Sequence, residues 1–125
     1  MVNDPRSLDT IVGTNLHMDI LSDLAAALAG SIGIAPSSNL DPTRKAPSLF
    51  EPVHGSAFDI AGKGVANPIG AIWSASEMLK WIGESEAGER LIEAVEKVCY
   101  QGLKTRDLGG QLDTAGFVKA VIEVL

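Results

Sequence analysis

With 125 residues the chain is long enough for one domain but short for two, and its hydrophobic content of 46% with 21% charged residues excludes a disordered protein. The formal net charge of -6 and the scattered basic residues argue against a nucleic-acid partner, because binding to phosphates requires clustered Lys and Arg. No apolar run is long enough to cross a membrane and the single cysteine, Cys99, cannot form an internal disulfide, so we expect a cytoplasmic protein.

The first third of the chain mixes short apolar runs with one helix. We expect a short buried strand at residues 8–13 and a helix at residues 19–29, which Gly30 ends. A second short buried strand is expected at residues 31–35. The apolar side chains that share one face of the expected helix are Ile20, Leu21, Leu24 and Leu28.

The middle of the chain is expected to contain little regular structure. Residues 36–47 are rich in Ser, Asn, Asp and Pro, which favours a loop. Residues 49–53 contain Leu49, Phe50 and Val53 and are expected to form the end of a strand. This strand leads into a glycine-rich segment at residues 54–64.

The second half of the chain is expected to be helical. Asn67 followed by proline is a typical helix start, and Gly83 ends this helix. A second helix is expected at residues 87–101, and a last one begins at about Thr114. The apolar side chains expected to be buried are Ile69, Ile72, Trp73, Met78, Leu79 and Ile82, then Leu91, Ile92, Val95, Val98 and Cys99, then Phe117, Val118, Val121, Ile122 and Leu125. This chain has too few strands to cover these faces, which indicates a missing sheet.

Two carboxylates, Asp19 and Asp23, lie four residues apart on one face of the first expected helix. A divalent cation such as Mg²⁺ or Mn²⁺ would bind both, because hard cations prefer carboxylate oxygens. From the spacing alone, two solvated acids on the polar face of the helix are the better interpretation. His17 lies off this face, so we expect it to have a structural role or to act behind the ligands.

The segment 51–64 is a candidate ligand-binding loop. Gly55 would allow a ligand to approach the backbone closely, Ser56 adds a hydroxyl donor, and Asp59 could accept two hydrogen bonds from a ribose diol. There is no G-x-G-x-x-G fingerprint and no phosphate-binding P-loop. A glycine-rich surface turn with solvated side chains explains the pattern equally well, and His54 fits either a ligand contact or a structural role.

Several motifs, taken in order, make the chain resemble the isopropylmalate/isocitrate/tartrate dehydrogenase family. They are Asp19-Ile-Leu-Ser-Asp23, Glu51-Pro-Val-His-Gly-Ser-Ala57, Asp59-Ile-Ala-Gly-Lys-Gly64, Ala66-Asn-Pro68 and Asp107-Leu-Gly-Gly110. The tartrate/D-malate dehydrogenase branch is the most similar, because Asn15-Leu-His-Met-Asp19, the proline-marked loop at 34–42 and Ser48-Leu-Phe50 look like that branch.

The resemblance implies an NAD-dependent enzyme that oxidises and then decarboxylates a small malate-like 2-hydroxy dicarboxylic acid with the help of Mg²⁺ or Mn²⁺. It assigns Asp19 and Asp23 to the metal. Asp59 becomes the acceptor of the adenosine ribose. The residues assigned to the dinucleotide are His54, Gly55, Ser56, Ala57, Asp59, Ile60 and Asn67.

The resemblance also implies a fold, a domain division and an incomplete site. The expected fold is α/β, the helix-rich C-terminal portion of the isopropylmalate dehydrogenase-like fold without much of its sheet. Residues 1–30 would end the smaller domain, which forms a homodimer, and residues 31–125 would belong to the larger NAD-binding domain. No catalytic residue of the family matches this segment, so Tyr100 and Lys63 are given no such role, and we expect the segment alone to be inactive. The alternatives are a segment of 3-isopropylmalate dehydrogenase and a non-catalytic nucleotide-binding or assembly module.

Overall fold

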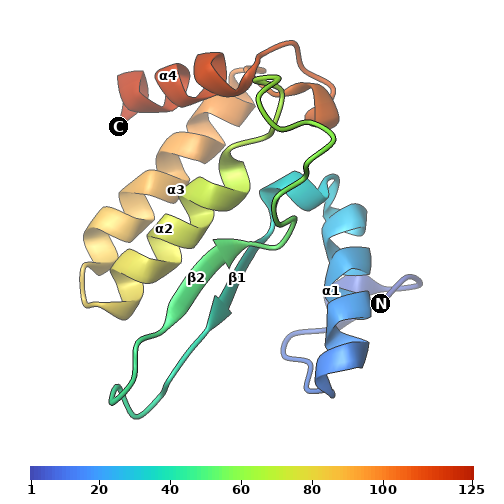
Figure 1. Cartoon of the computed structure of the whole chain (residues 1–125). Helices are drawn as coiled ribbons and strands as arrows, with labels where there is room; N and C mark the ends of the chain where they lie inside the picture. The colour runs from blue at the N-terminus through green and yellow to red at the C-terminus, as the bar shows by residue number, and fades with distance from the viewer.

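The computed structural model describes residues 1–125, which form a helix-rich α/β structure with a single two-stranded antiparallel sheet (Figure 1). The helices are α1 Asn15–Ala29, α2 Ile69–Trp81, α3 Ser85–Tyr100 and α4 Thr114–Val124, the strands are β1 Pro36–Asn39 and β2 Leu49–Pro52, and three short 3-10 turns are η1 Pro5–Ser7, η2 Ile32–Ile34 and η3 Arg106–Leu108. The expected fold class is confirmed, including the small sheet. None of the helices is both long and apolar enough to cross a membrane.

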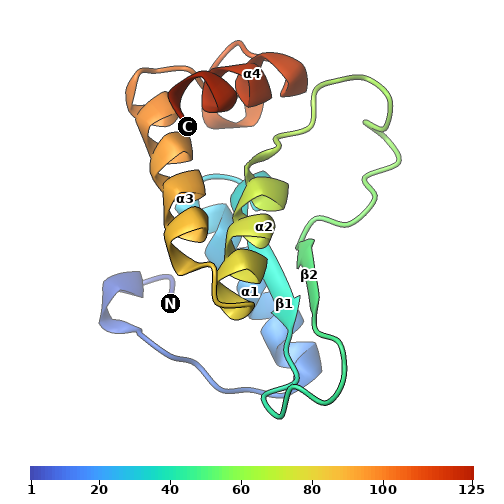
Figure 2. The ribbon, with the colours of Figure 1, turned by 90° about the vertical axis from the view of Figure 1, so that its left-hand side faces the viewer.

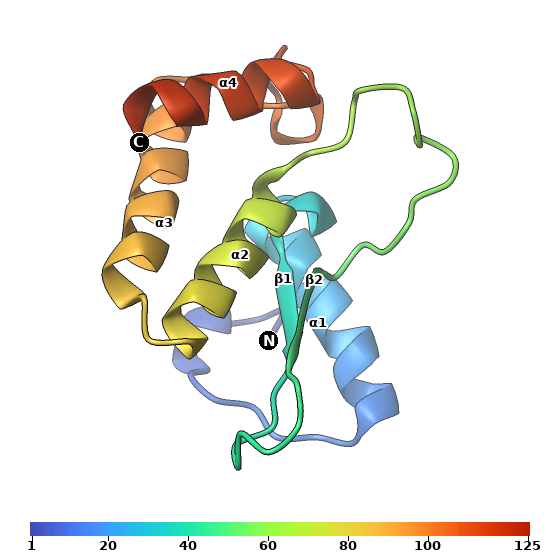
Figure 3. The ribbon, with the colours of Figure 1, turned by 60° about the vertical axis from the view of Figure 1, so that its left-hand side comes forward.

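The helices α2, α3 and α4 form one body, in which α2 and α3 run side by side and α4 crosses one end of them (Figure 1). The hairpin packs against α2, and α1 lies on the far side of the hairpin from this body. Figures 2 and 3 show the segment between β2 and α2 as a wide loop that extends away from the helices. The candidate ligand-binding residues at 54–60 therefore lie outside the packed body, whereas Asn67 lies at the start of α2.

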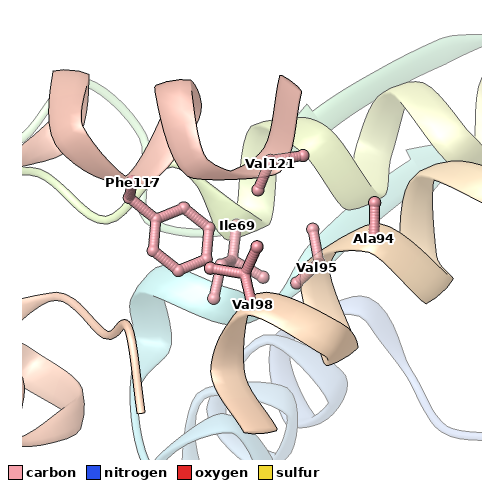
Figure 4. Close-up of a cluster of buried hydrophobic side chains, with 6 residues drawn as sticks. All are labelled: Ile69, Ala94, Val95, Val98, Phe117 and Val121. Atoms are coloured by element: carbon pink, nitrogen blue, oxygen red, sulfur yellow. The ribbon is translucent and has the colours of Figure 1, made fainter. Parts of the chain in front are cut away.

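The hydrophobic core lies between α2, α3 and α4 (Figure 4). It consists of Ile69, Ala94, Val95, Val98, Phe117 and Val121. The helices α2 and α3 also meet at Gly88, whose carbonyl accepts a 2.8 Å hydrogen bond from the buried Ser76 hydroxyl. These contacts hold the body together, because buried apolar area is the main source of stability.

The expected burial of several other apolar side chains is wrong for this chain. Exposed side chains are Trp73 and Met78 of α2, Ile82 directly after it, Ile122 of α4, and Leu125 directly after that helix. Helical spacing predicts which side chains share a face, but a face is buried only where another element covers it. The two strands present do not cover these faces, as the expectation of a missing sheet implies.

Two expected strands are wrong. Residues 8–13 pair with nothing, and their backbone is irregular, because a strand needs a neighbour and none lies beside this segment. The segment 31–35 contains the turn η2 instead. There the Ser31 hydroxyl accepts a 3.0 Å hydrogen bond from the Gly33 N–H, and the Ala35 N–H donates to the Ile32 carbonyl. Such local bonds compete with strand pairing.

The hairpin corrects the expected loop at residues 36–47. The first four of these residues form β1, in which Pro36 stands opposite Pro52 and Asn39 opposite Leu49. The backbone of β1 forms hydrogen bonds with β2, and this pairing does not require apolar side chains in β1. The polar composition of residues 36–39 therefore did not indicate a strand. The strand expected at residues 49–53 is confirmed as β2.

The remaining expected helices are confirmed within a few residues. Although α2 begins at Ile69, the Asn67 side chain performs the expected capping role, because its oxygen accepts a 2.9 Å hydrogen bond from the Ile69 N–H. The Asp113 carboxylate caps α4 in the same way, accepting from the Gly116 N–H at 2.7 Å. The first helix begins four residues before the expected start, at Asn15.

Candidate functional site

The carboxylates of Asp19 and Asp23 line one cavity of about 300 Å³ between α1 and the hairpin. The α1 wall also contains Ser22, and the opposite wall is formed by the hairpin and the residues that follow it, Ser37, Glu51, Pro52, Val53 and Gly55. The two predicted metal ligands therefore face the beginning of the predicted nucleotide loop. This proximity was not evident from their separation in the sequence.

Both aspartates are available to an external partner. The Asp19 carboxylate accepts only a long 3.3 Å hydrogen bond, from Asn15, and Asp23 makes neither a side-chain hydrogen bond nor an ion pair. Two carboxylates supply hard oxygen ligands suited to Mg²⁺ or Mn²⁺, but no group of three or more ligating side chains gathers in this chain. The donor set fits part of a metal shell.

His17 does not join this cavity. Its Nδ1 atom lies 2.9 Å from the hydroxyl oxygen of Thr14, the residue before α1. This contact is within one turn of the helix start and fits the structural role expected for His17.

A second cavity, of about 210 Å³, collects five of the seven residues predicted to bind a dinucleotide. These five are His54, Ala57, Asp59, Ile60 and Asn67. Gly55 lines the cavity of the two aspartates instead, and Ser56 is exposed and lines neither. The other walls are formed by Ser31, Ile32, Gly33, Val65, Ala66 and Asp107. No Lys or Arg lines this cavity.

The loop between the two cavities has an unusual backbone. Gly55 has φ +63°, and Ala57 has φ +41°, a conformation that costs a non-glycine residue of the order of 1–3 kcal/mol. The Ala57 conformation is held by its carbonyl, which accepts hydrogen bonds from the N–H groups of Ile60 and Ala61. A Cβ atom added to Gly55 would meet nothing within 4 Å, so the backbone is open to a ligand there.

The polar side chains of this loop are only partly used by the protein. The Nδ1–H group of His54 donates to the Gly55 carbonyl oxygen at 2.8 Å, which leaves Nε2 as an acceptor. The exposed Asp59 carboxylate makes no hydrogen bond within the chain, so both of its oxygens remain able to accept from a ligand.

Asn67 differs, because it is 7% exposed and its side chain is engaged at both ends. Its oxygen caps α2, and its Nδ2 group donates to Asp107 Oδ2 at 2.8 Å. Only one amide hydrogen remains for a ligand.

Asp107 is the wall residue to which sequence reasoning gave no role, although the motif Asp107-Leu-Gly-Gly110 contains it. Its Oδ2 atom also accepts a short hydrogen bond from the Ser31 hydroxyl. Partial burial alone would raise the pKa of Asp107, but the favourable interactions with Ser31, Thr105 and Asn67 outweigh it and lower this pKa. The Thr105 hydroxyl is fully buried and close to the carboxyl, yet it lies outside normal hydrogen-bond geometry.

Consecutive residues after the end of β2 line the two cavities. Val53 and Gly55 line the cavity of the two aspartates, whereas His54 between them lines the cavity of Asp59. A ligand that occupied both cavities would pass over the open backbone at Gly55. The arrangement can thus bring one end of an extended ligand near the paired carboxylates.

Comparison with known proteins identifies similar sequences over the whole chain. The family profile described as isocitrate/isopropylmalate dehydrogenase matches residues 1–121. A probable tartrate dehydrogenase/decarboxylase from Agrobacterium vitis is 58% identical over 125 residues, covering 100% of this chain and 34% of the relative. An isocitrate/homoisocitrate dehydrogenase from Thermus thermophilus is 54% identical over 125 residues, covering 100% and 36%.

Among solved structures, isocitrate dehydrogenase from Methylococcus capsulatus matches with a TM-score of 0.92 and 44% identity. The match covers 98% of this chain and 36% of that one. The chain therefore spans about a third of the length of the curated relatives that it matches.

Proposed function

This chain belongs to the isocitrate/isopropylmalate dehydrogenase family, and we propose that it is part of an NAD-dependent, divalent-metal-dependent dehydrogenase. The proposed substrate is a malate-like 2-hydroxy acid, tartrate or D-malate, which is oxidised at its hydroxyl group and decarboxylated. The relative named as a probable tartrate dehydrogenase/decarboxylase supports this choice. The observation that carries the proposal is the loop at residues 53–55, which contributes a wall to the cavity of the paired aspartates and a wall to the cavity of Asp59.

The cavity of Asp59 suits the adenosine end of NAD. Asp59 would accept hydrogen bonds from the ribose diol, and His54 Nε2 and the open Gly55 backbone would offer further contacts. The cavity contains two carboxylates, Asp59 and Asp107, and no cationic side chain, so an additional 2′-phosphate would be repelled. Its volume of about 210 Å³ is small for a whole dinucleotide. We propose that the rest of the dinucleotide binds to the part of the enzyme that corresponds to the two thirds of the relatives outside the match.

Asp19 and Asp23 would hold the divalent cation, which when bound stabilises negative charge on the substrate oxygen. In this chain the two carboxylates contribute charge and oxygen ligands, and Ser22 and Ser37 add polar groups to the same walls. No residue of this chain is given a proton-transfer role, so we propose that the acid and base groups come from the absent part.

We also propose that residues 1–30 belong to a smaller domain that forms a homodimer, and residues 31–125 to a larger nucleotide-binding domain. The position of α1, away from the helical body and joined to it mainly at η2, supports this division (Figure 1). The exposed Leu16, Ile20 and Leu28 of α1 supply apolar surface for a partner subunit.

The metal proposal is tested by titrating the chain with Mn²⁺ and measuring binding by calorimetry. Asp23→Asn should weaken the affinity by about tenfold or more, because one charged ligand is lost. Asp9→Asn, which makes the same change in a different cavity, should leave the affinity unaltered. Equal affinities of the wild type and Asp23→Asn for Mn²⁺ would contradict the metal proposal and support the interpretation of the two aspartates as solvated acids on a helix face.

The cofactor proposal is tested by comparing NAD with NADP. Asp59→Asn should reduce the ratio of the affinity for NAD to the affinity for NADP, because it removes the negative charge that repels a 2′-phosphate. Equal binding of both dinucleotides by the wild-type chain would contradict the role given to Asp59.

A second candidate is a nucleotide-binding or assembly module without chemistry, because the candidate sites of these 125 residues hold binding groups and no assigned acid or base. The two are separated by measuring the intact mass of the sample and then NAD reduction with D-malate, tartrate and isopropylmalate in the presence of Mn²⁺. Turnover by a sample of only these 125 residues would contradict the proposal that the absent part is required.

A further inference from the structure

Three segments that are distant in the sequence meet at one carboxylate oxygen beside the cavity of Asp59. Asp107 Oδ2 accepts from the Ser31 hydroxyl, 76 residues away, and from the Asn67 amide, 40 residues away. The three segments are the start of η2, the cap of α2 and the turn η3. A single charged acceptor thereby connects elements that also meet at the hydrophobic core, where Ile34 of η2 and Leu108 of η3 pack against the cluster that contains Ile69.

The packing at this junction is tight. A Cβ atom added to Gly33 would lie 2.9 Å from Asn67 Cβ and 3.2 Å from Asp107 Oδ2. The Ser31 hydroxyl, which donates to Asp107, also accepts from the Gly33 N–H at 3.0 Å. The wall formed by residues 31–33 therefore lies directly against the Asn67 side chain and has little freedom to shift.

Asn67 carries the effect of Asp107 to the helix. The amide orientation that places Nδ2 on Asp107 also directs the oxygen to the Ile69 N–H at the start of α2. Without an acceptor at Asp107, this orientation of the amide would be held by the Ile69 N–H alone, and the Nδ2 group would lose its partner in the protein.

We propose that Asp107 is a positioning residue for the nucleotide cavity: its carboxylate fixes residues 31–33 and the Asn67 amide in the arrangement that lines this cavity together with Asp59. The identity of the ligand, NAD, rests on the proposed function. The hydrogen bonds by which Asp107 holds the cavity wall do not depend on it. The ionised form of the Asp107 carboxylate stabilises this arrangement, because hydrogen bonds to a charged acceptor are stronger than those to a neutral one. Asp107 itself is given no catalytic part.

The experiment measures hydrogen exchange by mass spectrometry on peptides that cover residues 31–35 and 66–72 of the full chain. Asp107→Ala should increase exchange in both peptides, and Asp107→Asn should restore most of the protection because its side-chain oxygen can still accept. Ser31→Ala, which removes one donor only, should give a smaller increase. The matched control is Asp113→Ala, which removes a carboxylate that caps α4 and lines a different cavity.

NAD affinity is measured on the same variants. Asp107→Ala should weaken binding by about tenfold, because the cavity wall would no longer be held in the arrangement that the ligand requires. Asp113→Ala should change the affinity by less than about twofold even if it lowers the melting temperature equally, because the Asp113 carboxylate caps α4 and does not line the cavity of Asp59.

Unchanged exchange in Asp107→Ala, or an equal increase in Asp113→Ala, would overturn the positioning role whether or not NAD binds. A wild-type chain that fails to bind NAD would instead refute the proposal that this chain supplies the nucleotide surface, while the exchange data still decide the role of Asp107.

Discussion

The helical body and the first half of the chain differ sharply in burial. Of the 13 buried residues, only Ala26 lies in residues 1–66, whereas all six members of the core cluster belong to α2, α3 and α4 (Figure 4). In the first half, Leu16, Ile20 and Phe58 are more than half exposed. The body therefore holds most of the buried apolar surface that stabilises the chain, and the first half contributes little to it.

The candidate sites lie in the less buried part. Asp19 and Asp23 are on α1, and His54 and Asp59 are on the wide loop, so both sets belong to the region with little core of its own. The body contributes mainly the cap residue Asn67 and Asp107. The binding groups of this chain therefore lie on segments with few buried contacts, and contacts with the body or with a partner would be needed to fix their positions.

The largest expected effect is in the core of the body. Phe117 is fully buried, so Phe117→Ala should reduce the free energy of unfolding by about 3–5 kcal/mol. Ile20 on α1 is 60% exposed, so Ile20→Ala should change it by less than about 0.5 kcal/mol. Chemical denaturation followed by circular dichroism measures both.

If Phe117→Ala does not fold, Phe117→Leu keeps most of the volume and should show a smaller loss in the same direction. A loss for Ile20→Ala as large as that for the Phe117 variant would break the comparison. It would mean that α1 is covered in solution, as in a dimer, and the loss would then depend on protein concentration.

The sequence predicted the body better than the first half for a physical reason. Capping and helical spacing are local, so Asn67, Gly83 and Thr114 marked the helix ends within a few residues. Strands depend on distant partners. The apolar run at 8–13 has no partner here and is irregular, whereas the polar β1 has one and is a strand.

The next effect tests how closely the helices of the body pack. A Cβ atom added to Gly88 would lie 2.8 Å from the Ser76 backbone oxygen and 2.9 Å from Lys80 Cγ. Gly88→Ala should therefore reduce the free energy of unfolding by about 1–3 kcal/mol, although alanine favours a helix. The control is Glu89→Ala at the next, exposed position, which should stay within about 0.5 kcal/mol.

A stabilised Gly88→Ala variant would show that α2 and α3 can separate without cost, and the body would then resemble the loosely held first half. The fluorescence of Trp73 and Trp81, both on α2, reports the unfolding of the body and serves as a second measurement.

The candidate sites were predicted only in part. The resemblance to a family identified five residues that line one cavity, and helical spacing alone paired Asp19 with Asp23. Neither indicated that one oxygen of Asp107 would accept hydrogen bonds from both Ser31 and Asn67, because this contact depends on how three distant segments pack. The closeness of the two cavities likewise follows from the hairpin, whose first strand the composition concealed.

The smallest effect concerns the tip of the hairpin, outside the body. The Asp41 carboxylate accepts hydrogen bonds from the N–H groups of Thr43, Lys45 and Ala46, and the bond from Ala46, then those from Thr43, lower its pKa from 3.8 to about 2. Because the pKa is lowered on folding, the stabilisation is complete above pH 3.8 and is lost as the pH falls towards 2.

Asp41→Asn should therefore flatten the decline in stability between these pH values and leave the slope near neutral pH unchanged. Thr43→Ala, which keeps its N–H donor but removes the hydroxyl, should have a weaker effect. The measurement is the NMR titration of the Thr43, Lys45 and Ala46 amides, with acid unfolding as the second readout. A wild-type midpoint near 3.8 would mean that the Asp41 carboxylate does not accept these hydrogen bonds in solution and that the hairpin tip is not held in this arrangement.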